Sequence, residues 1–109
     1  MEDFTVSSDI IRGHIDTIIL KLLSDNDKYG YQISKLISLA SDGKYELKEA
    51  TMYSSLKRLN KDGFIKSYWG DETQGGRRRY YQITDSGRDL YVKNKNNWEF
   101  AKEIIEKLI

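Results

Sequence analysis

The fold is decided by residues 48–63, which read Lys48-Glu-Ala-Thr-Met-Tyr-Ser-Ser-Leu-Lys-Arg-Leu-Asn-Lys-Asp-Gly63. Met52, Leu56 and Leu59 are spaced four and three residues apart, so in a helix they form one apolar stripe. Gly63 is a suitable residue to end this helix. A helix of about 14 residues is about 21 Å long and fits the major groove of B-DNA. The hydroxyl and cationic residues expected to point away from the stripe are Thr51, Ser54, Ser55, Lys57, Arg58 and Lys61.

The composition indicates one small domain. The chain has 109 residues, of which 39% are hydrophobic and 32% charged, and it contains no cysteine. These values allow a core, and the lack of cysteine excludes disulfides and thiolate metal sites. No apolar run is long enough to cross a bilayer, and the N-terminal MEDFTVSS lacks the features of a signal peptide. We therefore expect a cytoplasmic, nucleoid-associated protein that does not contact membranes.

The positive charge is concentrated in the middle of the chain, although the net charge is only +1. Residues 1–28 carry three cations and six anions, residues 29–84 carry ten and six, and residues 85–109 carry five and five. These counts give net charges of −3, +4 and 0. The basic excess therefore surrounds the 48–63 helix and the run Arg77-Arg78-Arg79, where an anionic partner would be attracted.

Two helices are predicted before the 48–63 stretch. Apolar residues recur with helical spacing from residue 10 to residue 24, and this pattern predicts one continuous amphipathic helix. Gly13 lies inside it, where glycine costs about 1 kcal/mol relative to alanine, so we expect a closely packed partner there. Residues 25–28 have the composition of a turn, and a second helix is predicted over 29–40. The alternating residues 45–47 predict a short strand.

A β-hairpin and a long helix are predicted after that stretch. Residues 64–69 and 79–83 are rich in β-branched and aromatic residues and flank a glycine-containing loop. Three helices followed by a hairpin form the winged helix-turn-helix plan, so the expected fold class is α+β and mostly helical. Thr84 is a suitable N-cap for a helix over 85–109, which would be about 37 Å long. We expect a DNA-binding domain over 1–84 and a dimerisation helix over 85–109.

The dimerisation helix is predicted because so long a helix exceeds what this small domain can cover. From Trp98 onward its apolar residues are spaced three, four and three residues apart, which is a short heptad pattern. The same helix of a second copy is the simplest partner for the uncovered stripe. The residues expected at the dimer seam are Tyr91, Trp98, Ala101, Ile105 and Leu108.

Several short motifs follow one another in a specific order over residues 10–90. They are Arg12-Gly13, Ile15-Asp16, Leu20-Lys21-Leu22-Leu23, Tyr29-Gly30-Tyr31, Ala50-Thr51-Met52-Tyr53, Leu56, Leu59, Gly63-Phe64-Ile65, Arg79-Tyr80-Tyr81, Ile83-Thr84 and Gly87. Their order and spacing resemble the PadR family of bacterial transcriptional regulators. The resemblance implies a homodimer clasped through its terminal helices, and repression by binding an inverted repeat in a promoter. It also implies that a tryptophan of the terminal helix can stack on flat aromatic compounds in a pore at the dimer interface, as in some small members.

The DNA-contacting residues are expected on the 48–63 helix and on the hairpin. Arg58 can fork to guanine O6 and N7, and hydroxyls beside it can meet bases or phosphates. Lysines more often hold phosphates, which position a protein without specifying sequence. The tyrosine at the edge of the apolar stripe has a packing role first and a polar contact second. The candidates are Lys48, Thr51, Tyr53, Ser54, Lys57, Arg58, Lys61, Arg77, Arg78 and Arg79.

Each of these candidates has a plainer interpretation. Lysine and arginine side chains on a helix commonly just point into solvent. One arginine of the hairpin could form an ion pair with Asp71 or Glu72 instead of contacting DNA. Because a strand alternates, Arg77 and Arg79 should share one face opposite Arg78. For Trp98, which lies in the region of the family's stacking tryptophan, a structural contact in the dimer seam is favoured over a platform for a small aromatic effector.

Other classes of function have little support in the sequence. There is no nucleophile elbow, phosphate loop or metal cluster, so we expect neither an enzyme nor a cofactor. His14 is the only histidine and has no cysteine or second histidine with which to bind zinc. Asp16 is expected in a structural hydrogen bond or ion pair. The alternative function is a winged-helix protein-interaction module without DNA binding.

Overall fold

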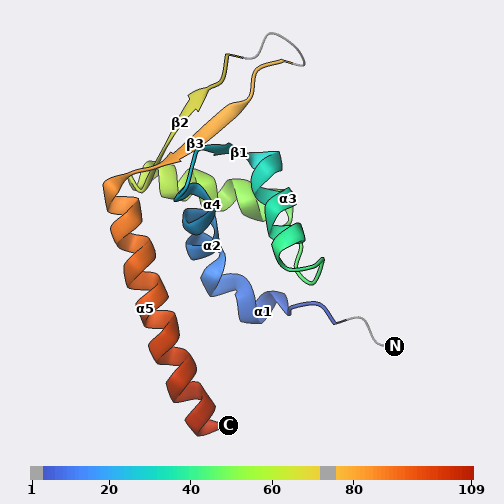
Figure 1. Ribbon diagram of the computed structural model, residues 1–109, viewed down its shortest axis with the longest axis vertical. Helices are drawn as coiled ribbons and strands as arrows, with labels where there is room; N and C mark the ends of the chain where they lie inside the picture. Colours follow the sequence, from blue (N-terminus) through green and yellow to red (C-terminus); the bar gives the residue numbers. More distant parts are fainter. Residues whose placement is uncertain (1–3, 72–75) are drawn as a thin grey trace.

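The computed structural model describes residues 4–71 and 76–109 as helices arranged around a small antiparallel sheet (Figure 1). The expected α+β, mostly helical, winged helix-turn-helix fold is confirmed. Residues 1–3 and 72–75, which include Glu72, lie outside the described residues. The elements in chain order are α1 (Ser8–Ile11), the 3-10 turn η1 (Arg12–His14), α2 (Ile15–Leu23), β1 (Lys28–Tyr29), α3 (Gly30–Ala40), α4 (Glu49–Lys61), β2 (Ile65–Trp69), β3 (Arg79–Ile83) and α5 (Asp85–Leu108).

The core forms around α2, which packs against α4, α5 and β3. Leu20 and Ile19 have no exposed surface, and the apolar stripe of α4 is buried against them as one cluster. Burying each such side chain contributes about 1.5–3 kcal/mol. The stripe predicted over 48–63 is therefore what fixes α4 to the domain. The side chains with the least exposure are Ile19, Leu20, Leu23, Ile33, Leu56, Leu59 and Ile65.

The predicted continuous helix over residues 10–24 is wrong, because the chain makes a 3-10 turn between α1 and α2. The break includes Gly13, which favours the helix least among the residues there. A Cβ atom on Gly13 would meet nothing within 4 Å, so the expected close partner is absent from the described residues. Ile10 is 71% exposed and lies outside the core despite its helical spacing. The core-forming part of this segment therefore begins at Ile15.

The sheet has three strands in the order β1-β3-β2, and the sequence did not predict β1. Lys28 pairs with Tyr81 and Tyr29 with Tyr80, although residues 25–28 were expected to be only a turn. A two-residue strand is too short to show alternation, which explains the miss. Residues 45–47 form no strand. The first strand ties the α2–α3 connection to the hairpin.

Lys28 is only 7% exposed, although lysine is rarely buried in proteins. Its ammonium donates to the carbonyl oxygen of Leu22 at 2.5 Å and to the side chains of Asp25 and Asn26, both at 2.7 Å. These acceptors compensate for the loss of hydration. The hydrogen bond from Lys28 also lowers the pKa of Asp25 below its ordinary value. The contact closes the end of α2 onto the strand that follows.

The expected cap of the last helix is confirmed. The Thr84 hydroxyl accepts a hydrogen bond from the backbone N–H of Gly87 at 3.1 Å and donates one to the carbonyl oxygen of Gly63 at 2.8 Å. A Cβ atom on Gly87 would lie 2.1 Å from the carbonyl oxygen of Phe64. Glycine is therefore needed at residue 87 for close approach, and it joins the start of α5 to the base of the hairpin.

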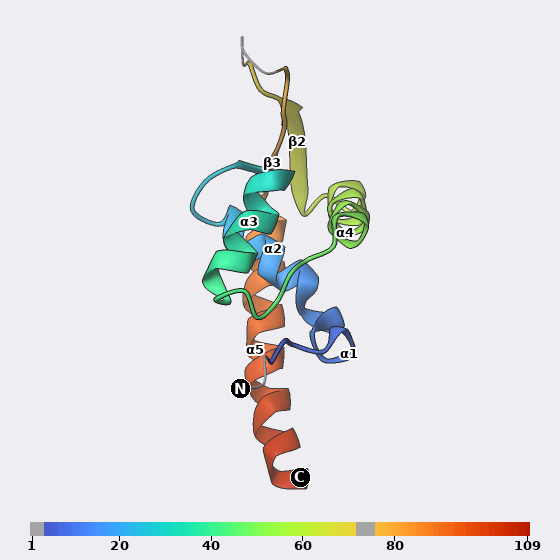
Figure 2. The same cartoon turned by 90° about the vertical axis from the view of Figure 1, so that its right-hand side faces the viewer.

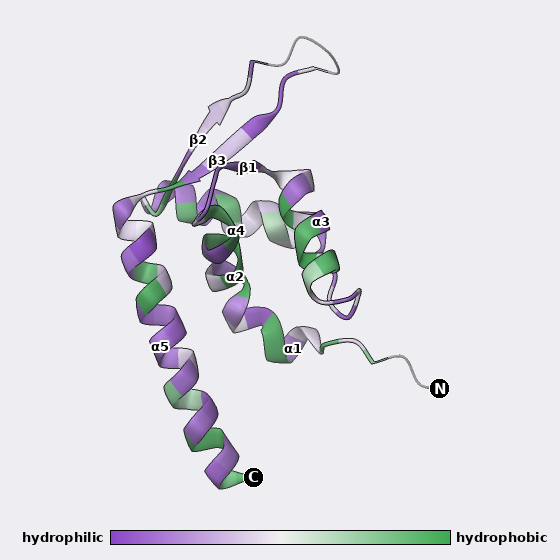
Figure 3. Ribbon diagram, viewed as in Figure 1, coloured by the Kyte–Doolittle hydropathy of each residue, from purple (hydrophilic) through white to green (hydrophobic). Residues whose placement is uncertain are grey.

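The second half of α5 extends past the other helices (Figures 1 and 2). Leu90 and Tyr91, near its start, pack against the core. Farther along α5, bands coloured as hydrophobic and hydrophilic residues alternate along the ribbon (Figure 3). Phe100 is 67% and Leu108 is 77% exposed. The division into units over 1–84 and 85–109 stays a prediction.

Candidate DNA-binding surface

Helix α4 presents a polar face to solvent. Thr51, Tyr53, Ser54, Lys57, Arg58 and Lys61 are all exposed, and Lys48 is the exposed N-cap. Ser55 is the exception among the residues expected to point outward, because it is 5% exposed. It lies three residues after Met52 and one before Leu56, so helical geometry turns it toward α2. The remaining hydroxyls and cations form a continuous strip along the helix.

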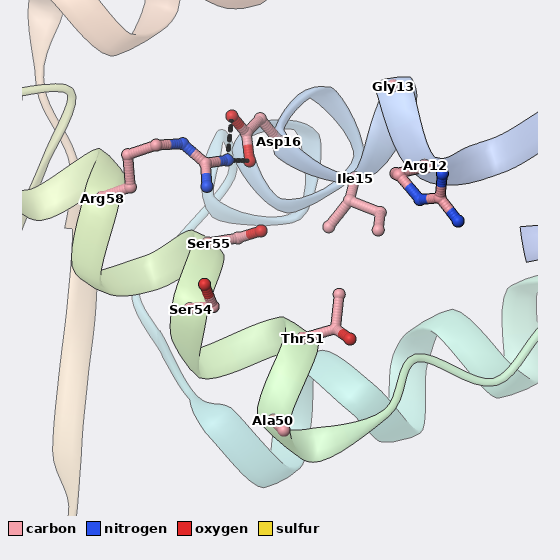
Figure 4. Close-up of a pocket in the computed structure, with 9 residues that line it drawn as sticks. All are labelled: Arg12, Gly13, Ile15, Asp16, Ala50, Thr51, Ser54, Ser55 and Arg58. Atoms are coloured by element: carbon pink, nitrogen blue, oxygen red, sulfur yellow. Dashed lines mark hydrogen bonds and ion pairs between the residues drawn. The ribbon is translucent and has the colours of Figure 1, made fainter. Parts of the chain in front are cut away.

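Arg58 is held by Asp16 of helix α2. The Nη2 atom of Arg58 lies 2.5 Å from Oδ1 and 2.6 Å from Oδ2 of Asp16 (Figure 4). The pair borders a cleft of 520 Å³ between η1 and α4, which Thr51, Ser54 and Arg12 also line. The expected ion pair of Asp16 is confirmed, and its partner is a residue expected to read DNA.

Tyr53 lies against the start of α3. A Cβ atom on Gly30 would be 2.5 Å from the Tyr53 hydroxyl oxygen, so the ring occupies the space that a side chain at residue 30 would fill. The tyrosine is nevertheless 44% exposed. The expected packing role of the ring is confirmed, while a contact between its hydroxyl and DNA stays a prediction.

The arginines of the hairpin lie on aromatic rings. Arg77 and Arg79 are 5.2 and 6.0 Å from the ring centre of Trp69, whereas Arg78 is 4.9 Å from that of Tyr29. The expected separation of Arg78 from the other two is thus confirmed, although β3 itself begins only at Arg79. Stacking on a ring orders a guanidinium, and the Nη2 atom of Arg79 also donates to the Ser67 hydroxyl oxygen at 2.7 Å.

Additional contacts fix the base of the hairpin. The Tyr68 hydroxyl donates to Asp27 at 2.5 Å, and its ring stacks on that of Tyr80 at 5.6 Å. The hydrogen bond to the Asp27 carboxylate raises the pKa of Tyr68 to about 12, because ionised tyrosine could not donate to it. The β2–β3 hairpin, which forms the wing, is therefore connected to the α2–α3 turn as well as to α4.

A second hollow lies between the N-terminal helices and α5. It has a volume of 560 Å³, and Trp98 stands at its edge with 39% exposure. The ring of His14 meets that of Trp98 edge to face at a centroid distance of 4.7 Å. Lys21 and Lys95 line the same hollow. His14 thus packs against helix α5.

The described residues contain no group of three or more His, Asp or Glu side chains placed to hold a metal ion. Helices long and apolar enough to cross a membrane are likewise absent from this part of the chain.

Sequence reasoning missed three features of this surface. The partnership of Asp16 with Arg58 joins residues 42 positions apart, and no local pattern reports it. Tyr29 and Trp69 were not assigned as platforms for arginine. The hairpin register places Trp69 opposite Arg79, so a careful alignment of the two strands would have found that contact.

A helix with an exposed basic and hydroxyl face, followed by an arginine-bearing hairpin, defines the winged helix-turn-helix class of DNA-binding proteins. The profile of the "Transcriptional regulator PadR-like family" matches residues 19–93. The chain belongs to the PadR family, as its sequence motifs predict, and members of this family are DNA-binding transcriptional regulators.

Solved structures and sequence relatives agree with this assignment. A transcriptional regulator from Clostridium thermocellum is 50% identical and superimposes with a TM-score of 0.89 over 96% of this chain and 99% of that one. A PadR family regulator from Clostridium difficile is 38% identical, with a TM-score of 0.75 over 87% and 97%. Uncharacterized protein X of Lysinibacillus sphaericus is 46% identical over 93% of both chains. Transcriptional regulator YqjI of Escherichia coli is 27% identical over 86% of this chain and 44% of its own length.

Proposed function

We propose that the protein is a transcriptional repressor that binds a palindromic promoter site as a homodimer. The observation that carries this proposal is the strip of hydroxyl and cationic side chains along α4, which leads through Gly63 directly into the arginine-bearing wing. Two such helices in a dimer would enter successive major grooves about 34–36 Å apart. A repressor acts by occupying the promoter, so deleting the gene should raise expression of a reporter placed behind its own binding site.

Within this interface, different residues have different tasks. Thr51, Ser54 and Arg58 meet base edges, and Tyr53 supports α4 from the side of α3. Phosphates are held by the lysines at both ends of the helix, and the wing follows the backbone or enters a narrow minor groove, which attracts arginine. The residues assigned to phosphate are Lys48, Lys57, Lys61, Arg77, Arg78 and Arg79.

Selection of duplexes from a random pool, followed by gel shifts, tests this division. Arg58→Ala should reduce the preference for selected over random duplexes, because it removes a bidentate contact worth about 1–3 kcal/mol. Lys57→Ala should weaken both kinds of duplex alike and lower the salt slope by about 0.9. Equal losses on all duplexes for both variants would contradict the assignment.

The homodimer is supported by the uncovered apolar side of α5. Trp98, Ala101, Ile105 and Leu108 continue the stripe that Tyr91 begins, and Ile105 is 48% exposed. A second copy of α5, packed along this stripe and the hollow beside α2, would remove these side chains from water. Sedimentation equilibrium at micromolar concentrations should give twice the mass of one chain. A single-chain mass over the whole range would refute the dimer.

We also propose that a small aromatic effector releases the protein from DNA. It is supported by Trp98 at the edge of a 560 Å³ hollow that Tyr91 also lines. A flat ligand stacked there would alter the spacing of the two α4 helices by moving α5. A cationic dye should quench tryptophan fluorescence in the wild type and lose this effect in Trp98→Ala. Unchanged quenching in the variant would contradict it.

The alternative function is a protein-interaction module that does not bind DNA. Its support is the same apolar stripe on α5, which a different chain could cover. Replacing Arg77, Arg78 and Arg79 together with alanine separates the two proposals. The repressor should lose much of its affinity for duplex DNA, since three counterion-releasing contacts disappear. Retention on DNA that equals that of the wild type would favour the interaction module.

A further inference from the structure

The guanidinium of Arg58 is occupied on one side before any DNA arrives. One nitrogen, Nη2, contacts both carboxylate oxygens of Asp16, at 2.5 and 2.6 Å. Within residues 4–71 and 76–109, Arg58 makes no other hydrogen bond or ion pair. Its Nη1 and Nε N–H groups do not contact Asp16 and therefore remain able to donate.

The surroundings of this pair are those of an interface and not of a core. The Arg58 side chain is 52% exposed and that of Asp16 is 29% exposed. Both border the cleft between η1 and α4, and Thr51 and Ser54 line the same cleft (Figure 4). An exposed ion pair contributes little to stability, typically below about 1 kcal/mol. The pair lies beside Thr51 and Ser54, which we propose contact the edges of DNA bases, and this placement points to a role in DNA binding.

We propose that Asp16 is a specificity-determining residue of the DNA interface, which it shapes by positioning Arg58. This inference rests on the proposed DNA-binding function. The carboxylate fixes the guanidinium in one orientation, so less side-chain freedom is lost when its remaining N–H groups donate to a guanine. It also offsets the positive charge of Arg58. Attraction to phosphates, which is the same for every sequence, is thereby reduced, while the directional hydrogen bonds to a base remain.

These two effects act in opposite directions on the two kinds of DNA. Without the carboxylate, Arg58 is a mobile cation that can reach any nearby phosphate, so affinity for random DNA rises. The same mobility costs affinity for the preferred site, because the arginine must then be ordered on binding. Asp16 thus widens the difference between the two affinities.

The test compares the full-length wild type with Asp16→Asn on two probes, a duplex selected by the wild type and a scrambled duplex of the same composition. The ratio of the two dissociation constants should fall by about tenfold in Asp16→Asn, and the salt slope on the scrambled duplex should steepen by about 0.9. Asp16→Glu, which keeps the carboxylate, should restore most of the ratio. Asp62→Asn removes the same charge at the end of α4 and should leave the ratio unchanged.

The contribution of Arg58 is isolated by a double-mutant cycle. In an Arg58→Ala background, Asp16→Asn should have no further effect on either probe, because the residue through which it acts is gone. A purely structural role would instead lower the melting temperature and weaken both probes equally in either background, and this result would overturn the inference.

Failure of the inference can be separated from failure of the proposed function. If the wild type discriminates between the two duplexes and Asp16→Asn discriminates equally well, the inference alone is overturned. If the wild type binds neither duplex, both it and the DNA-binding function fail.

Discussion

Helices α4 and α5 both carry an apolar stripe, but only one of the stripes is covered by the rest of the chain. On α4, Met52, Leu56 and Leu59 are at most 2% exposed. On the second half of α5, Ile105 is 48% and Leu108 is 77% exposed. The two stripes have comparable sequence patterns, so periodicity alone does not distinguish a helix that completes a core from one that needs a partner.

The difference assigns separate tasks to the two helices. The buried side of α4 fixes the helix on the core, so its opposite face, which we propose contacts DNA, keeps a defined geometry. The uncovered side of α5 is free to associate, and association would set the distance between two copies of α4. Stability of the domain should therefore depend on α4 and the residues that pack beside it, and self-association on the distal part of α5.

The largest effect is expected from Leu56→Ala on α4. Leu56 is 1% exposed, so truncation leaves a cavity in the core and should lower the free energy of unfolding by about 2–5 kcal/mol. Urea denaturation measures this loss. The matched control is Leu108→Ala on α5, which should leave unfolding of the domain nearly unchanged. Equal losses in the two variants would remove the distinction between the helices.

A smaller effect is expected where α5 joins the domain. In Gly87→Ala, the new methyl group would meet the Phe64 carbonyl oxygen, a backbone atom that cannot rotate away, at 2.1 Å. We expect a loss of about 1–3 kcal/mol in thermal or urea unfolding. Gly13→Ala is the control, because nothing lies within 4 Å of the added atom. Its stability should stay the same or rise by up to about 1 kcal/mol. Wild-type stability in Gly87→Ala would show that α5 is not tightly seated.

Self-association should respond to the distal part of α5. Ile105→Glu places a charge in the proposed seam and should weaken the dimer at least tenfold, or about 1.4 kcal/mol, as measured by sedimentation over a concentration series. Unfolding at low protein concentration should change little. Glu106→Gln, one residue farther along the helix, should leave association as it is. An unchanged dimer in Ile105→Glu would place the interface elsewhere.

The smallest effect concerns the wing and its pH dependence. The pKa of Tyr68 is about 12 while it donates to Asp27, so the neutral hydroxyl is favoured in the folded protein. Because a raised pKa stabilises the protonated form, the contribution is complete below about pH 10 and is lost as the pH rises through 12. Absorbance titration of wild type and Asp27→Ala should show one tyrosine ionising earlier in the variant. Identical titrations would indicate that the contact does not persist in solution.

The parts predicted correctly are those specified by neighbours in sequence. Helix α4 follows from three apolar residues on one face, and the start of α5 from the cap at Thr84. The hairpin follows from alternation in two short segments. The separation of Arg78 from Arg77 and Arg79 was also predicted from alternation. The aromatic rings on which these arginines lie were not predicted.

The errors occur where distant residues compete with a local pattern. Continuous apolar spacing predicted one N-terminal helix, but the chain turns at η1 and leaves Ile10 outside the core. Strand β1 exists because β3 offers it hydrogen-bonding partners more than fifty residues away. Glycine is a weak helix former, but at residue 87 the close approach of the Phe64 carbonyl oxygen requires it, and no local pattern reports that contact.

The sequence by itself determined the order of most elements, the family and the polar face of helix α4. Each of these depends on residue spacing within a few turns or strands. The tertiary structure alone decided that Asp16 holds Arg58, that Trp69 and Tyr29 carry the wing arginines, and that the stripe of α5 is left open. These contacts arise only when the core brings distant segments together, and one-dimensional periodicity contains no information about which segments will meet.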